Sequence, residues 1–470
     1  MERFDLAIIG AGPAGMAAAR EAAELGLRVA LLDEQARAGG QIYRDVDRVA
    51  SMRGDILGAD YTEGARLTAR LRQEGIRHVA GAVVWAIEEG FRLSYTQAGR
   101  GAQLAADRVL LATGALERPM PLPGWTLPGV MTAGAGQILL KQSGLLARRS
   151  VLVGSGPLLY LIAAQMVRAG VPPLAMVETQ TRADLARAMR HLGGAVQGWS
   201  YMLKGIGLLA EITRARVPRY RAATGISIEG EGRAEAVRFT IRGREHRIAC
   251  DTVFLHHGVV PNTQTARSLG VTHRWRADQS CFAPVLDEWG GADVPGVFIA
   301  GDGGGIGGAK AAGCAGRLAA LHIAEGAGRL TEADRDRRAV RLRSALAREL
   351  AVRPFLDAAY PPFVDALDPA DTTIVCRCEE VTAGTIRGHA KQLGCLGPNQ
   401  AKAFGRAGMG PCQGRFCGLT VTSLLARANG RTPDETGYYR IRPPLKPVTL
   451  GELAAMEDTA TDNAEQETAT

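Results

Sequence analysis

Four of the eight cysteines lie close together in the sequence, and their thiolates could bind a metal centre. Cys376 and Cys378 are separated by one residue, and Cys412 and Cys417 follow in a glycine-rich stretch that can turn backbone N–H groups toward sulfur. Four thiolates suit either a [2Fe–2S] cluster or a tetrahedral zinc ion. Because paired cysteines of zinc sites are mostly separated by roughly two to four residues, the Cys376–Cys378 spacing favours the cluster, with zinc or free thiols as alternatives.

A second set of residues has the spacing of a phosphate-binding loop. Gly10, Gly12 and Gly15 follow a short apolar run at 4–9 and precede an alanine-rich stretch, which is typical of a buried strand followed by a helix. In such a loop the first glycine permits the tight turn, the second lets the backbone approach a pyrophosphate, and the third allows close helix–strand packing. The phosphates would also meet free N–H groups at the helix start. The predicted cofactor-binding residues here are Gly10, Gly12, Pro13, Ala14 and Gly15.

Acidic residues follow where a ribose would be bound. Asp33 comes after the next apolar run, 28–32, and its carboxylate can accept hydrogen bonds from ribose hydroxyls. Glu34 is the neighbouring alternative. Because strand, glycine loop, helix and acid occur in the order of a βαβ unit, we predict dinucleotide binding rather than a glycine turn without a ligand.

The chain contains a second, altered unit of the same plan. A strand-like run at 150–153 leads into Gly154 and Gly156, but Leu159 stands where a third small residue belongs. A bulky side chain there would push the helix away from the strand. Glu178 follows the next strand and could hold a ribose, while no arginine pair follows it to hold a 2′-phosphate, which disfavours NADP. The alternatives are a working NAD site and a retained scaffold whose site is empty or repurposed.

Three further motifs narrow the type of dinucleotide protein. They are Gly39-Gly40-Gln41, Ala112-Thr113-Gly114 and Gly301-Asp302. Together with the two glycine loops they resemble the two-dinucleotide-binding flavoprotein superfamily, which has the glutathione-reductase-like fold. The resemblance implies bound FAD, with Asp302 on the ribityl chain and the helix from Gly308 directed at the flavin pyrimidine, where a helix N-terminus stabilises negative charge. Taken alone, Gly301-Asp302 could also be a helix N-cap.

No residues of acid–base or nucleophilic catalysis are predicted. Disulfide reductases of the glutathione-reductase-like fold carry a cysteine pair just after the Gly-Gly motif, and this chain has none there, which excludes a dithiol mechanism. We interpret His256-His257, at the end of a strand, as structural. The isolated cysteines are interpreted as small apolar residues; they are Cys250, Cys281, Cys314 and Cys395.

The cysteine segment and the whole chain resemble known proteins. Residues 375–381 with 410–417 resemble the bacterioferritin-associated-ferredoxin-like [2Fe–2S] domain. From about residue 4 to 455 the chain is similar to the A (alpha) subunits of opine oxidases and to the matching subunits of hydroxyproline dehydrogenases and bacterial hydrogen cyanide synthase. The motifs that carry this resemblance lie at 39–44, 112–119, 124–130, 376–380 and 440–448.

The resemblance implies a complex. An amino-acid-oxidase-like beta subunit would oxidise a C–N bond on its own FAD, and a small ferredoxin-like gamma subunit could complete the assembly. In related complexes an FMN lies between alpha and beta, and the alpha nucleotide site holds FAD, NAD or ATP. FAD is therefore the first choice for this chain, with NAD and ATP as alternatives.

The predicted fold class is α/β, with two Rossmann-like dinucleotide-binding domains and a small C-terminal cysteine-rich α domain. The predicted domains are a discontinuous FAD-binding domain (1–120 and 280–330), an NAD-binding-like domain (121–279), a helical connector (331–372), the [2Fe–2S] domain (373–430) and an extension with a disordered acidic tail (431–470).

Composition and charge exclude other classes. The 470 residues are 46% hydrophobic, which provides material for several cores, and the net charge of +8 is spread along the chain without a basic block interleaved with aromatic residues. We therefore expect no nucleic-acid partner. We find neither a long apolar run nor a signal pattern, so we expect no transmembrane segment and a cytoplasmic protein, with peripheral membrane association only through partners.

Two functions fit these motifs. In the first, the chain is the electron-transfer subunit of an amino- or imino-acid dehydrogenase or oxidase and passes electrons from flavin to the cluster. In the second, it is a stand-alone NAD(P)H-dependent flavin reductase whose cluster is the electron exit, and Leu159 argues against this. A zinc-stabilised scaffold without enzymatic activity is a third hypothesis.

Overall fold

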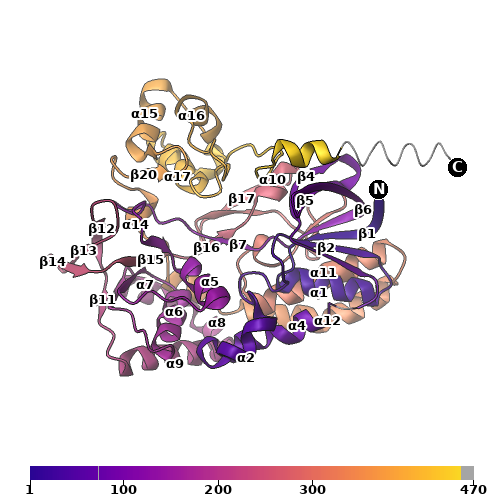
Figure 1. Cartoon of the computed structure of the whole chain (residues 1–470), viewed down its shortest axis with the longest axis horizontal. Helices are drawn as coiled ribbons and strands as arrows, with labels where there is room; N and C mark the ends of the chain where they lie inside the picture. The colour runs from indigo at the N-terminus through magenta and orange to yellow at the C-terminus, as the bar shows by residue number, and fades with distance from the viewer. Residues whose placement is uncertain (72, 457–470) are drawn as a thin grey trace.

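The computed structural model describes residues 1–71 and 73–456 and contains two Rossmann-like sheets side by side with a helical C-terminal region (Figure 1). This confirms the predicted α/β class. The acidic tail predicted from Glu457 lies outside the described residues. Within the described part of the chain, no helix combines the length and apolarity needed to cross a bilayer.

The first sheet is built around parallel strands in the order β3-β2-β1-β6, with β19 beside β6. Their bounds are β1 (Glu2–Ile9), β2 (Val29–Asp33), β3 (Ile76–Ala80), β6 (Arg100–Leu111) and β19 (Val297–Ile299). The antiparallel strands β5 (Arg92–Gln97) and β4 (Val83–Glu88) extend it from the first half of β6. Every residue of β2 is buried, because the parallel part of the sheet is covered on both faces.

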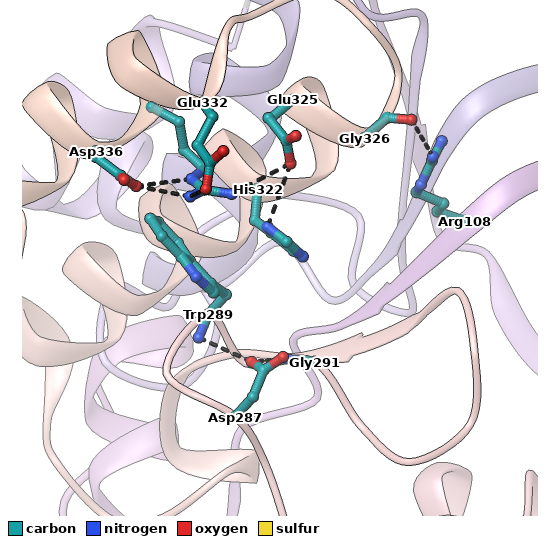
Figure 2. A network of polar contacts seen from close by, with 10 residues as sticks. Arg108, Asp287, Trp289, Gly291, His322, Glu325, Gly326, Glu332 and Asp336 are labelled. Atoms are coloured by element: carbon teal, nitrogen blue, oxygen red, sulfur yellow. Dashed lines mark hydrogen bonds and ion pairs between the residues drawn. The ribbon is translucent and has the colours of Figure 1, made fainter.

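Helices α1 (Pro13–Glu24) and α11 (Ala309–Gly326) pack together under this sheet, and α12 (Glu332–Leu350) packs on α11 (Figure 1). Small residues permit the close approach of α1 and α11, since a Cβ on Gly316 would lie 2.2 Å from the carbonyl oxygen of Ala14. Figure 2 shows how the turn between α11 and α12 is held. Arg335 forms ion pairs with Glu325 and Glu332 and lies over the Trp289 ring, and His322 stacks on the same ring.

The second sheet is parallel throughout, in the order β11-β10-β9-β15-β8. Its strands are β8 (Val130–Thr132), β9 (Ser150–Gly154), β10 (Ala175–Glu178), β11 (Arg219–Arg221) and β15 (Thr252–His256). A separate antiparallel sheet consists of β12 (Thr224–Glu229), β13 (Ala236–Ile241) and β14 (Arg244–Ala249). The helices of this part of the chain are α5 (Ala133–Ser143), α6 (Pro157–Arg168), α7 (Arg182–Ala188), α8 (Leu192–Gln197) and α9 (Trp199–Arg214).

The two Rossmann-like parts are joined by a pair of short antiparallel strands, β7 (Ala115–Glu117) and β16 (Val259–Pro261). The chain leaves the first sheet through β7 and returns through β16, α10 (Gln264–Ser268) and the hairpin of β17 (His273–Arg276) and β18 (Cys281–Pro284). Helices α2 (Val46–Leu57), α3 (Ala59–Thr62) and α4 (Gly64–Ala69) connect β2 with β3.

The C-terminal region is mostly helical and has its own buried cluster, which includes Ile386, Val421 and Leu424. After α13 (Arg353–Ala359) and α14 (Val364–Leu367), a short pair β20 (Ile374–Cys376) and β21 (Val381–Thr382) precedes α15 (Ala383–Leu393), α16 (Pro398–Gly405), α17 (Gly418–Ala428) and α18 (Pro433–Thr436). Beyond α18 the chain runs back over the first sheet, toward β4 and β5 (Figure 1).

Candidate functional site

The first glycine loop has the geometry of a nucleotide-binding turn. Gly10 has φ +106°, and a Cβ there would lie 2.4 Å from the carbonyl oxygen of Ala112. A Cβ on Gly15 would lie 1.9 Å from the carbonyl oxygen of Gly10, so the fold itself requires both glycines. Gly12 is different, because a Cβ there would meet no atom closer than Gly40 Cα at 3.8 Å. The space beside Gly12 is therefore left open for a ligand.

Asp33 connects β2 to this loop. Its carboxylate accepts hydrogen bonds from the backbone N–H of Ala11 at 2.6 Å and of Gln35 at 2.7 Å. Burial raises the pKa of Asp33, and these two N–H groups oppose that rise. Asp33 thus holds the loop in place and has fewer free lone pairs for a ribose than its position in the sequence suggested.

Glu34 presents the more accessible carboxylate. About half of its side chain is exposed, and one oxygen accepts a 2.8 Å contact from the Lys446 ammonium. Burial alone would raise the pKa of Glu34, but the hydrogen bond and positive charge of Lys446, together with Arg44 and Arg415, hold it below its usual value. Glu34 is therefore an ionised acceptor at the end of β2.

The other predicted cofactor residues of the first part lie around the same loop. A Cβ on Gly40 would be 2.9 Å from Gly12 Cα, and Gln41 follows with an exposed side chain. Thr113 and Gly114 are bonded to Asn262, whose N–H donates to the Gly114 carbonyl at 3.0 Å. Gly301 lies against α1, since a Cβ there would be 2.9 Å from Ala14 Cβ. The carboxyl ends of β1, β2, β6 and β19 thus bring these motifs together, as parallel sheets do at a binding crevice.

Asp302 is not the N-cap of α11, which is Gly308, but its carboxylate holds the turn that leads into this helix. Its Oδ1 accepts hydrogen bonds from Gly307 N at 2.8 Å and Gly308 N at 2.9 Å, which fixes the turn before α11. Its Oδ2 makes no hydrogen bond to any residue that the structure describes. One oxygen therefore shapes the start of the helix, and the other remains able to accept a hydroxyl.

The second glycine loop differs from the first. Glu178 is fully buried, and its carboxylate accepts the Tyr160 hydroxyl at 2.6 Å and Arg219 Nη2 at 2.7 Å. This burial and the adjacent carboxylate raise the pKa of Tyr160 far above its usual value. Of the two alternatives for this unit, the occupied carboxylate favours the retained scaffold over a working NAD site. No local pattern indicated this, because Arg219 belongs to a strand that pairs with β10 only in the folded chain.

Two more side chains fill the second loop. Leu159 is fully buried and packs with Leu152 and Phe254 between α6 and the sheet. The His256 ring lies over Gly156, where a Cβ would be 3.1 Å from Nε2. Nδ1 of His256 is 2.6 Å from Glu117 Oε1, and the other oxygen of Glu117 accepts the N–H of Gly134. An imidazole thus covers Gly156, the counterpart of the open Gly12, and a leucine replaces the tightly packed Gly15.

The four clustered cysteines form two thiol pairs. The Cys376 and Cys417 thiols are neighbours, as are those of Cys378 and Cys412, and Cys417 Sγ lies 3.9 Å from the Tyr439 hydroxyl. The members of the first pair are buried, whereas Cys378 is exposed. A Cβ on Gly410 would lie 2.1 Å from Cys378 Cβ, so only glycine fits beside this thiol.

Backbone N–H groups surround the buried pair. The contact with Cys417 and the N–H groups of Gly408, Glu379 and Cys378 lower the pKa of Cys376 to about 6, although burial opposes this. Such N–H groups stabilise thiolate charge and suit a cluster site. Over residues 1–71 and 73–456, however, no group of three or more His, Cys, Asp or Glu side chains is arranged to hold a metal ion. The four thiols are ligands of the type that a cluster uses, but their positions in the described residues do not form a metal site.

The other cysteines are separate from this group. Cys250, Cys281 and Cys395 are buried and Cys314 is partly buried. Burial raises the pKa of the Cys250 and Cys281 thiols to about 11, so both are neutral side chains.

Hydrogen bonds and an ion pair connect the cysteine loop (residues 412–417) with the surroundings of the first glycine loop (residues 10–15). Gln264 Nε2 on α10 donates to the carbonyl oxygen of Gln413 at 3.2 Å, and Arg415 donates to the Leu445 carbonyl at 2.7 Å. Leu445 N in turn donates to Trp85 O on β4, and Lys446 pairs with Glu34. The residue after Cys412 is thus tied to α10, and the segment 444–446 joins the cysteine loop to the end of β2. These long-range contacts were not predicted, although Lys446 lies inside one of the motifs that carried the resemblance.

Comparison with known proteins agrees with this architecture. Residues 4–328 match the pyridine nucleotide-disulphide oxidoreductase family, and residues 372–457 match the sarcosine oxidase A3 domain. The L-proline dehydrogenase structure from P. horikoshii superposes with a TM-score of 0.70 at 20% identity, covering 96% of this chain and 80% of that chain, which shows a shared fold.

Two groups of relatives match almost end to end. The chain is 44% identical to the A subunit of the opine oxidase of Agrobacterium tumefaciens (strain Ach5), over 97% of this chain and 92% of that protein. It is 33% identical to the HcnB subunit of the hydrogen cyanide synthase of Pseudomonas aeruginosa, over 94% of this chain and 96% of that protein. The chain therefore belongs to the family that includes the A-type subunits of opine oxidases and the HcnB subunits of hydrogen cyanide synthases, FAD-dependent oxidoreductases with the pyridine nucleotide-disulphide oxidoreductase fold.

Proposed function

We propose that this chain is the electron-transfer subunit of a multi-subunit dehydrogenase or oxidase that acts on amino or imino acids. FAD would occupy the first glycine loop, and a [2Fe–2S] cluster would be held by Cys376, Cys378, Cys412 and Cys417. The observation that carries the proposal is the bonded connection between the two sites, from Gln413 to Gln264 and from Lys446 to Glu34.

The chain's own residues would bind and orient these groups. Gly12 and the start of α1 would face the pyrophosphate, and the free oxygen of Asp302 would accept a ribityl hydroxyl. The cysteine thiolates and the backbone N–H groups around Cys376 would hold the cluster. A bound flavin supplies electron-pair exchange and an iron–sulfur cluster accepts single electrons.

The second glycine loop argues against a stand-alone NAD(P)H-dependent reductase. A ribose at Glu178 would have to displace Tyr160 or Arg219 from a buried carboxylate, which leaves charged or polar groups without partners. His256 also covers Gly156, where a pyrophosphate would approach. NAD or ATP remains an alternative ligand for the first loop rather than for the second.

Partners follow from the same proposal. The relatives are named as the A-type or alpha subunits of opine and sarcosine oxidases and as the HcnB component of a synthase. An amino-acid-oxidase-like FAD protein would carry the substrate pocket, FMN would lie at its interface with this chain, and a small ferredoxin-like protein could complete the complex. No substrate pocket on this chain is part of the proposal.

Rapid mixing of the purified chain with NADH tests the proposal. We expect the flavin to stay oxidised on the time scale of turnover. Iron and acid-labile sulfide should accompany the purified protein and be lost in Cys412→Ser but retained in the matched control Cys395→Ser, a buried cysteine outside the quartet. Fast flavin bleaching by NADH would favour the stand-alone reductase, and zinc in place of iron and sulfide would favour the scaffold.

A further inference from the structure

Two buried cations lie beside the first glycine loop without a carboxylate partner. Lys141, on α5, is 2% exposed. Its Nζ donates to Ile42 O at 2.9 Å, to Gln41 O at 3.0 Å and to Gln137 Oε1 at 2.9 Å. All three acceptors are neutral, so the ammonium charge is hydrogen-bonded but not compensated.

Arg44 is the second cation, and its guanidinium has no hydrogen-bond acceptor, charged or neutral, among the described residues. The residue is 7% exposed, and its Nε is buried without a hydrogen-bond partner. Its guanidinium makes no hydrogen bond to any residue in 1–71 or 73–456. A buried guanidinium has several donors to satisfy, and an unmatched one marks the place of a missing acceptor.

The nearby carboxylates do not supply that acceptor. Asp33 is bonded to two backbone N–H groups, Glu34 pairs with Lys446, and Asp45 pairs with Arg37 and Arg48. They act on Arg44 only through their charge: burial lowers the pKa of Arg44 and the three carboxylates oppose this. Lys141 and Arg44 are also near enough to repel each other, since the charge of Arg44 adds to burial in lowering the pKa of Lys141.

Both cations are linked to the segment that touches the phosphate-binding turn: Arg44 belongs to it, and Lys141 reaches its carbonyls from α5. Gly40 lies against Gly12. Gln41 and Ile42, whose carbonyls hold Lys141, follow Gly40 directly, and Arg44 comes two residues later. The segment that carries Arg44 and accepts the hydrogen bonds of Lys141 therefore adjoins the space that Gly12 leaves open.

We propose that Arg44 forms an anion subsite of the first nucleotide site and binds a phosphate of the nucleotide, while Lys141, whose three N–H groups are already bonded, contributes its positive charge. This inference rests on the proposed nucleotide binding at that site. The planar guanidinium of Arg44 can bind a phosphate through two parallel hydrogen bonds, and Lys141 adds a compact charge. A phosphate would give Arg44 its missing acceptor and compensate two buried positive charges. The shared ligand chemistry is a phosphate chain, either the pyrophosphate of a dinucleotide or the triphosphate of a mononucleotide.

Calorimetric titration of the full-length chain, freed of bound nucleotide, tests the subsite. The probes are FAD, ATP and adenosine, which has no phosphate. Arg44→Gln should weaken binding of the phosphate-bearing ligand at least tenfold and reduce its salt dependence, while adenosine binding stays unchanged. Arg44→Lys should recover part of the loss, and the control Arg37→Gln, an exposed arginine that pairs with Asp45, should have no effect. Thermal unfolding of each variant checks that it is folded.

The outcomes separate the subsite from the function. If Arg44→Gln weakens the binding of FAD alone, the subsite binds the pyrophosphate of a dinucleotide. If it weakens the binding of ATP, the subsite binds a triphosphate. The subsite would be overturned if Arg44→Gln and wild type had equal affinities for FAD and ATP. It would also be overturned if the variant lost as much affinity for adenosine as for the phosphate-bearing ligands. Nucleotide binding at the first loop would stand in both cases. If the wild-type chain binds neither FAD nor ATP, the proposed function fails together with the subsite.

Discussion

The ammonium nitrogen of Lys446 lies 2.8 Å from a carboxylate oxygen of Glu34, and 412 positions of the sequence separate the two residues. The segment that ends at Lys446 also accepts hydrogen bonds from Gln413 and Arg415 of the cysteine loop. The chain therefore passes its cysteine loop and then returns to the first nucleotide loop. This contact places the segment beside the cysteine loop next to the end of β2.

The Lys446–Glu34 pair should add little to stability. Both side chains are more than a third exposed, and exposed ion pairs contribute about 0–1 kcal/mol because water screens them. We predict that Lys446→Ala lowers the free energy of unfolding in urea by less than about 1 kcal/mol. A loss several times larger would mean that the pair holds the C-terminal segment in place.

Gly12 and Gly15 should respond differently to the same substitution. Gly15→Ala places a Cβ 1.9 Å from the carbonyl oxygen of Gly10 and should destabilise the fold. Gly12→Ala meets nothing closer than 3.8 Å in the protein, so its unfolding should resemble that of wild type while its flavin content falls. Thermal unfolding and the flavin-to-protein absorbance ratio measure the two effects. Normal flavin content in Gly12→Ala would contradict the assigned role of this loop.

The buried Lys141 should make stability depend on pH. Burial lowers the pKa of Lys141 from 10.5 to about 7. Between these values the unfolded chain binds a proton that the folded chain does not, so this residue's contribution to stability rises with pH from 7 to about 10. In the nucleotide-free protein, the stability of wild type relative to Lys141→Met should therefore increase over this range. A difference that stays constant over this range would show that Lys141 keeps its ordinary pKa.

Two tyrosines that both donate to glutamate offer a matched comparison. Tyr160 donates to the buried Glu178, whereas Tyr201 donates to Glu349 at the surface. Tyr160→Phe should cost about 1–3 kcal/mol, because a buried carboxylate loses a partner, and Tyr201→Phe should cost less. Urea unfolding measures both. If both variants lowered the free energy of unfolding by the same small amount, the Glu178 carboxylate would not depend on Tyr160. The second loop could then still admit a ribose.

Much of the first site was predictable because its determinants are local. Gly10, Gly12 and Gly15 are set by the turn between β1 and α1, and the bounds of β1 and β2 differ by one or two residues from the apolar runs 4–9 and 28–32. Gly301-Asp302 was recognisable by its place between a strand and a helix.

Contacts between distant segments were not predictable. Arg219 reaches Glu178 from β11, Lys141 reaches Gln41 from α5, and Lys446 reaches Glu34 from beyond the cysteine region. Each depends on how sheets and helices are assembled, which periodicity and spacing do not encode. The sequence left the role of Glu178 open for this reason, since its position at a strand end is correct for a ribose and only the folded chain shows that its carboxylate is occupied.

Electron paramagnetic resonance of the assembled complex tests the central claim most directly. The chain would be co-purified with its amino-acid-oxidase-like partner, reduced anaerobically with the amino acid that the partner oxidises, and frozen. The account predicts the signal of a reduced [2Fe–2S] cluster in wild type, and flavin reduction without that signal in Cys412→Ser. Substrate-driven reduction of the flavins with no iron–sulfur signal in the wild-type complex would contradict it.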